Sequence, residues 1–196
     1  GEPPSRRFPD AAEALKAADK LETDSKFVEG KPAWEAVTEV MKRLKAEATS
    51  ARTTYALHEA AEKGDAGAIR RLLLVGAEVD RKNAAGWSAL HRAAAKGRSE
   101  ACKILAGAGA TVDARGPEDQ TPLHLAEDAE TVACLLDAKA SIEAKTRAGR
   151  TALHGAAISK REIVKLLLDR GAGVSSEDGE GLQPLHLAGS TEVAAL

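Results

Sequence analysis

Histidine is the side chain that most readily gains or loses a proton near neutral pH, and this chain of 196 residues has five. They are His58, His91, His124, His154 and His186, and each one directly follows a leucine. The intervals between them are 33, 33, 30 and 32 residues. Histidines that share a catalytic or metal site have no reason to keep such an interval. The spacing therefore indicates one structural unit that is used five times.

The same spacing argues against a metal site. Neighbouring layers of packed helices lie about 10 Å apart, whereas every ligand of a metal ion must come within about 2 Å of it. The enzyme motifs G-x-S-x-G, H-E-x-x-H and GxxxxGK[ST] do not occur in the chain either. We therefore expect no catalytic residues, no cofactor and no metal. An enzyme or a metal-binding protein stays an outside alternative.

The two cysteines, Cys102 and Cys134, lie within apolar helical patterns. This favours two buried thiols in a reducing, intracellular compartment over a disulfide. We expect the cytoplasm. The nucleus or an organelle stays open because the chain begins at Gly1 rather than Met, so that any targeting peptide would lie outside it.

Composition narrows the function classes further. The formal net charge is −2, with acidic and basic residues interspersed, which argues against a nucleic-acid binder. No run of 18 apolar residues occurs, so we expect no membrane insertion. Aromatic residues make up only 3% of the chain, which favours small helices that pack closely through alanine and leucine.

The elements that carry the histidines can be read from the aligned units. The four residues that end in histidine are YALH, SALH, TPLH, TALH and QPLH. The Ser or Thr hydroxyl can cap a helix, proline suits the first helical position, and the leucine is expected to face the core between units. We expect the histidine ring to bond the Thr side chain and nearby backbone, which ties the turn to the helix.

A second helix follows in the first four units, most clearly in residues 161–174, REIVKLLLDRGAGV. It ends at Gly76, Gly109 and Gly171 in three units, whereas Lys139 stands there in the third and would be strained in the left-handed conformation. The third unit is three residues short between its helices and the fourth is one short, so we expect a tighter loop or a trimmed helix there.

This pattern resembles the ankyrin repeat, a 33-residue turn–helix–loop–helix unit with T-P-L-H and a later G-A-x-V-[ND]. The resemblance implies an all-α solenoid of antiparallel helix pairs with turns, called fingers, that project to one side. It covers residues 50–82, 83–115, 116–145, 146–177 and, as a partial unit, 178–196.

Residues 1–49 form a separate N-terminal extension in which we predict helices over about 10–22 and 33–48. The second of these has a narrow apolar stripe that begins at Trp34 and continues through Val37, Met41, Leu44 and Ala48. Two interpretations stay open. The helix caps the open face of the first repeat, or it is an arm that docks on another protein with Trp34 as its anchor.

The resemblance also implies a protein-binding groove lined by the fingers and first helices, and its variable positions give candidate contact residues. They are Trp87, Lys96, Glu118, Gln120, Arg147, Arg150, Glu180 and Leu182, to which Trp34 of the extension is added. Trp87 is either an interface anchor or a ring that lies against the neighbouring finger.

The function expected from this pattern is non-catalytic binding of one or more partner proteins. In one version the chain is a scaffold or adaptor that binds through the groove and fingers. In the other it is a permanent subunit of a larger assembly, possibly in an organelle, held through the N-terminal arm and the open C-terminal repeat.

Overall fold

The computed structural model describes residues 52–158 and 160–188, and in that part of the chain it contains helices and turns but no strand. The helices are a first helix over residues 52–63, α3 (Ala66–Leu74), α4 (Ala89–Ala94), α5 (Ser99–Gly107), η3 (Pro117–Asp119), α6 (Pro122–Leu125), α7 (Ala129–Asp137), α8 (Ala152–Ala157), α9 (Arg161–Asp169) and η4 (Pro184–Leu187). The helices predicted over 10–22 and 33–48, and with them Trp34, lie outside the described residues.

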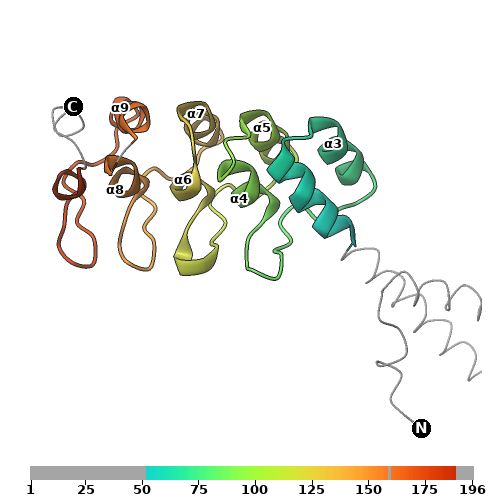
Figure 1. Cartoon of the computed structure of the whole chain (residues 1–196), viewed down its shortest axis with the longest axis horizontal. Coiled ribbons are helices and arrows are strands. Elements are labelled where there is room, and N and C mark those ends of the chain that lie inside the picture. The colour runs from blue at the N-terminus through green and yellow to red at the C-terminus, as the bar shows by residue number, and fades with distance from the viewer. Residues whose placement is uncertain (1–51, 159, 189–196) are drawn as a thin grey trace, which may run out of the picture. The chain divides into compact units, whose positions relative to one another are not determined.

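Helix pairs follow one another in chain order along a row (Figure 1). The second helices of the units, α3, α5, α7 and α9, form one layer, and the first helices form the layer beneath it. The finger turns extend from the first helices on the side away from the second helices (Figure 1). The expectation of an all-α repeat stack is confirmed.

Capping hydrogen bonds from side chains just before a helix fix where several of the helices begin. Ser88 precedes α4, and its hydroxyl oxygen accepts a hydrogen bond from the backbone N–H of His91 at 3.5 Å. Asp65 caps α3 and Asp128 caps α7 in the same way, each through a carboxylate oxygen. These side chains satisfy backbone donors that have no partner inside the helix.

The second helices end in the left-handed conformation that the sequence predicts. Gly76, Gly109 and Gly171 each have a φ of 88°, and Lys139 adopts a φ of 71° at the same position of the third unit. A side chain other than glycine is strained there because its Cβ approaches the following carbonyl.

The first helix of the short third unit is trimmed at its end. α6 has four residues, whereas α4 and α8 have six, and the Asp128 cap of α7 follows almost at once. The missing residues have therefore trimmed the end of the helix, one of the two outcomes expected from the sequence.

The first unit departs from the motif. Tyr55 holds the place that Ser88 and the threonines hold in later units, but the helix already runs from residue 52, so Tyr55 lies inside it. Neither glycine nor proline occurs in residues 52–54, so nothing there interrupts the helix before Tyr55.

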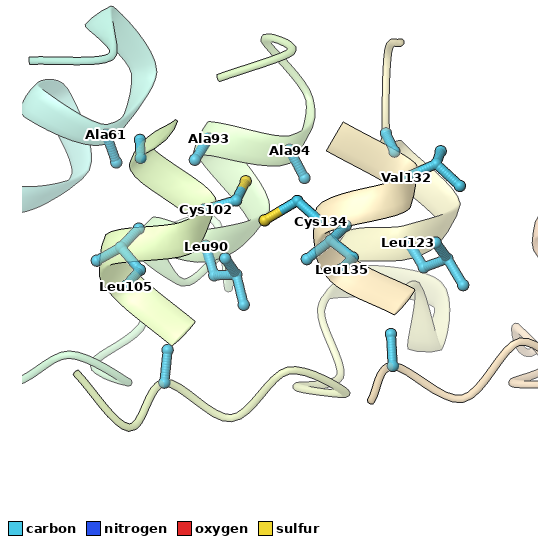
Figure 2. Close-up of a cluster of buried hydrophobic side chains, with 14 of the residues drawn as sticks. Ala61, Leu90, Ala93, Ala94, Cys102, Leu105, Leu123, Val132, Cys134 and Leu135 are labelled. Carbon is cyan, nitrogen blue, oxygen red and sulfur yellow. The ribbon is translucent and has the colours of Figure 1, made fainter. Parts of the chain in front are cut away.

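The core lies between neighbouring units and consists largely of alanine and leucine. Side chains of α4, α5, α6 and α7, among them Leu90, Leu105, Leu123 and Leu135, belong to one cluster of buried apolar residues that continues from unit to unit (Figure 2). The leucine before the histidine is at most 3% exposed in the first four units. The expectation that it faces the core is wrong for the fifth unit, where Leu185 is 58% exposed because no described helix covers it.

Candidate protein-binding surface

Each of four fingers is closed by one backbone hydrogen bond. The bonds run from the N–H of Asn83, Gly116, Thr146 and Asp178 to the carbonyl oxygens of Trp87, Gln120, Arg150 and Leu182 at 2.7–2.9 Å. Those four carbonyl oxygens also lie within hydrogen-bonding distance of a histidine Nε2 in the preceding unit. Each finger is thereby closed on itself and tied to its neighbour through a single atom.

The four cross-unit contacts have nearly the same length. His58, His91, His124 and His154 place Nε2 at 2.8, 3.1, 3.0 and 3.1 Å from these carbonyl oxygens. A carbonyl can only accept, so in His91, His124 and His154, whose Nδ1 faces no carbonyl, Nε2 carries the proton. The predicted tie between turn and helix is present, and the sequence pattern alone did not reveal that its other end lies in the next unit.

In the second to fourth units the other ring nitrogen, Nδ1, faces the start of its own helix. His91 Nδ1 lies 2.8 Å from Ser88 Oγ and 3.3 Å from the Ser88 backbone nitrogen. Thr121 and Thr151 make the same contacts with His124 and His154. Because Nδ1 accepts here, the neutral ring fits these sites. Burial accordingly lowers the pKa of His91 and of His124.

Adjacent fingers are also joined directly through their backbones. The N–H of Arg147 donates to the carbonyl of Glu118, and the N–H of Gly179 donates to the carbonyl of Ala148, both at 2.8 Å. Gly149 lies in the second contact, where an added Cβ would stand 2.8 Å from the Gly179 nitrogen. Only glycine allows the two fingers to approach this closely.

Charged side chains of the fingers pair with the next finger. Arg147 lies 3.3 Å from a carboxylate oxygen of Glu118 and 3.9 Å from one of Asp119. Arg150 lies 3.0 Å from Asp178, whose carboxylate is almost completely buried. The backbone N–H of Leu182, together with Arg150, holds the pKa of Asp178 below its ordinary value. Opposite charges of the third to fifth fingers thus pair with one another across the stack.

Trp87 is half-buried and already packs inside the stack. Its ring centroid lies 5.3 Å from that of His91, at an angle of 57°. A Cβ added to Gly116 of the next finger would stand 2.5 Å from the indole ring. The ring therefore lies against the neighbouring finger, and its role toward a partner stays a prediction.

The remaining predicted contact residues differ in how far their side chains are exposed. Lys96 is exposed and lies 3.6 Å from Glu62 of the preceding unit, which also pairs with Arg92. The hydrogen bond from Arg92 lowers the pKa of Glu62. Glu180 is exposed, whereas Gln120 and Leu182 are half-buried and take part chiefly through the backbone carbonyls described above.

A family comparison decides what this stack is. The sequence model for ankyrin repeats (3 copies) matches residues 34–116, 57–146, 110–178 and 126–196, which together span most of the chain. The chain belongs to the ankyrin-repeat family. None of the curated proteins compared with it matches.

The hydrogen bonds that one set of acidic residues makes to the next unit were not predicted from the sequence. Asp80 accepts hydrogen bonds from the backbone and hydroxyl of Thr111 at 2.8 and 2.6 Å, and Asp113 accepts from the Ser141 backbone at 3.0 Å. Glu143 does the same for Gly173. The signal was available, because an acidic residue recurs directly after Val or Ile in the first three units.

The described ankyrin repeats were searched for a metal site, a membrane-spanning helix and a reactive cysteine. No group of three or more His, Cys, Asp or Glu side chains in residues 52–158 and 160–188 is placed to hold a metal ion. Within the same ranges no helix is long and apolar enough to cross a membrane. Cys102 and Cys134 are buried free thiols, and burial raises the pKa of Cys102 to about 12. A thiol with so high a pKa is a poor nucleophile.

Proposed function

We propose that the chain is a non-catalytic scaffold that binds partner proteins through its fingers and first helices. Ankyrin repeats are in general protein–protein interaction modules. The observation that supports this role most is the fixed arrangement of the fingers, which are joined through Arg147 and Glu118 by both backbone and side chains. A surface that is ordered before binding loses less conformational entropy when a partner arrives.

The binding surface comprises the exposed charges of the fingers and the adjoining helix. Glu118, Arg147 and Glu180 expose their charged groups, and Lys96 extends the surface onto α4. The position of this surface is fixed by contacts between units that involve Arg150, Gln120 and Leu182. Trp87 contributes a half-buried aromatic ring beside it. Trp34 is proposed as a further contact from the extension. The mixed charges suit a partner that presents both acidic and basic groups.

A double variant, Glu118→Ala with Arg147→Ala, tests this proposal. Both side chains are well exposed, so removing the pair costs at most about 1 kcal/mol of stability and leaves the fold intact. We expect affinity capture of the bound protein, quantified by mass spectrometry, to fall at least tenfold.

The chain offers a matched control. Lys103 and Glu130 form a similar exposed ion pair between neighbouring units, at 3.8 Å, but on the second helices. Lys103→Ala with Glu130→Ala should leave capture unchanged. Equal capture by the two double variants and the wild type would contradict binding through the fingers.

The second candidate function is a permanent place in a larger assembly of unlike subunits. The observation that favours it is the exposure of Leu185 and Val174 at the C-terminal end of the described stack. In that case, Leu185→Glu should abolish capture, whereas the Glu118 and Arg147 double variant should retain it. The two candidates therefore predict opposite results for the same pair of variants.

A further inference from the structure

The last residue of each of the first three repeat units carries a positive charge. These residues are Lys82, Arg115 and Lys145, here called the basic row, and all three are exposed. Each directly precedes the residue whose N–H closes a finger, so the three residues lie at the same place on successive fingers. The fourth unit ends at Glu177, where the basic row stops.

Two of these cations are held in place by backbone carbonyl groups of the following unit. Arg115 Nη1 donates to the carbonyl oxygens of Asp119, at 3.0 Å, and of Lys145. Lys145 Nζ donates in turn to the carbonyl oxygen of Glu177 at 2.9 Å. A guanidinium has five N–H donors and an ammonium group has three, so both groups keep donors for a further acceptor.

The positive charges of the basic row are not neutralised within the described stack. Among residues 52–158 and 160–188, no carboxylate forms an ion pair with any of the three cations. Asp113 and Glu143, each two positions before a cation, instead accept hydrogen bonds from the backbone of the following unit. Arg147 and Arg150 differ in this respect, because each pairs with a carboxylate. The basic row is therefore available to a negatively charged ligand.

The spacing of the row determines which arrangement of negative charges fits it. Neighbouring layers of packed helices lie about 10 Å apart, and so do equivalent residues of neighbouring units. A polyproline II helix has three residues per turn and rises about 3.1 Å per residue, so every third side chain lies on one face at intervals of about 9 Å. A peptide in this conformation with Asp or Glu at every third position matches the basic row.

We propose that the basic row binds an acidic polyproline II segment of a partner protein, with Asp or Glu at every third position. One carboxylate meets each cation, and the Arg115 guanidinium, fixed by its carbonyl contacts, donates its free N–H groups to the middle one. This inference rests on the proposed scaffold function and names the chemistry of one segment of the partner. The fingers that carry the row follow one another along the stack (Figure 1).

A nucleic acid fits the basic row less well than such a peptide. Each strand of a duplex carries one phosphate about every 3.4 Å, which is much denser than one charge per repeat unit. Asp80, Asp113 and Glu143, two positions before the three cations, add negative charge to the same fingers. These carboxylates disfavour a continuous polyanion, whereas a peptide with separated charges avoids the repulsion.

An NMR titration of the isotope-labelled full chain with synthetic peptides, at low ionic strength, tests the proposal. The probe peptide has four Glu-Pro-Pro repeats, which favour polyproline II and place a carboxylate at every third residue. The control peptide has the same composition with its glutamates in one block. We expect the probe to shift the amide signals around Arg115 and Lys145, and the control peptide to bind at least about fivefold more weakly.

Two double variants locate the binding. Arg115→Gln with Lys145→Gln removes two charges but keeps a donor for each carbonyl contact, and affinity for the probe should fall at least about tenfold. Lys103→Gln with Lys165→Gln removes the same charge from exposed positions of α5 and α9, and affinity should change less than about twofold. If the first variant unfolds, Lys82→Gln should still weaken binding about threefold.

Three results would overturn the proposal. A probe that does not bind would exclude the basic row as a peptide site. Equal affinity for the two peptides would mean general attraction between charges and no recognition of their spacing. Tighter binding of a single-stranded oligonucleotide with the same number of charges would mean a nucleic-acid ligand. Capture of a whole partner is measured separately with the Glu118 and Arg147 double variant, so failure of this inference is distinguishable from failure of the scaffold function.

Discussion

His91 and Gln120 are joined across two units by a hydrogen bond of 3.1 Å from the imidazole Nε2 to the backbone carbonyl oxygen. That oxygen also closes the Gln120 finger through the N–H of Gly116. One imidazole thus holds the start of its own helix and the finger of the next unit. Three further histidines make the same cross-unit contact.

Replacing this histidine should destabilise the stack. His91→Ala removes a buried ring and leaves the Ser88 hydroxyl and the Gln120 carbonyl each short of a hydrogen bond, so we expect a loss of about 3 kcal/mol in denaturant unfolding. His186→Ala is the matched control. That ring is exposed, and the same change should cost less than about 0.5 kcal/mol. Equal losses in the two variants would contradict the structural role of the cross-unit bond.

Stability should also depend on pH through the buried histidines. The pKa values of His91 and His124 lie below the ordinary 6.5 in the folded chain, so the unfolded chain takes up protons first as the pH falls. Stability should therefore be full above about pH 6.5 and fall below it, by at most about 1.4 kcal/mol per pH unit for each ring.

Denaturant midpoints between pH 7 and pH 5 measure this, because carboxylates stay ionised over that range. His91→Asn should flatten the dependence. A stability that rises toward pH 5, or a slope that the variant leaves unchanged, would contradict the assignment of neutral buried rings.

Replacing Lys139, whose backbone adopts the left-handed conformation in the third unit, should stabilise the chain. Lys139 has a φ of 71° where the other three units have glycine, so Lys139→Gly should raise stability by about 1 kcal/mol. Gly109→Ala, which imposes the same strain on the second unit, should lower it by a similar amount. Thermal unfolding of both variants measures the two effects, and changes of the same sign in both would count against backbone strain as the cause.

The cysteines should be inert in the native chain. Because the pKa of Cys102 is about 12, about one thiol in ten thousand is ionised at pH 8. A disulfide-exchange reagent should label Cys102 and Cys134 only as fast as the chain opens, and labelling should become rapid in denaturant. Fast labelling of the folded chain would show that the thiols are accessible and would reopen a chemical role for them.

The repeated unit, its helices and their caps could be predicted from the sequence, because each depends on residues close together in the chain. The glycine at the helix end, the Ser88 cap and the trimming in the third unit are local effects of this kind. The strain at Lys139 was predictable for the same reason.

Contacts between units were harder to predict. The hydrogen bond from His91 to Gln120 spans 29 residues, and only the geometry of the stack brings the two together. Arg150 was predicted as a contact residue for a partner, but its guanidinium pairs with Asp178 of the next finger. The exposure of Leu185 depends likewise on what packs beyond it. The sequence pattern within one unit cannot predict which residues of another unit lie next to it.

The most direct measurement of binding through the fingers is site-specific photocrosslinking. A photoreactive amino acid placed at Arg147, on a finger, should crosslink to the partner protein, whereas the same group at Lys165, exposed on α9, should not. Crosslinks from both positions, or from Lys165 alone, would show that partners do not bind through the fingers.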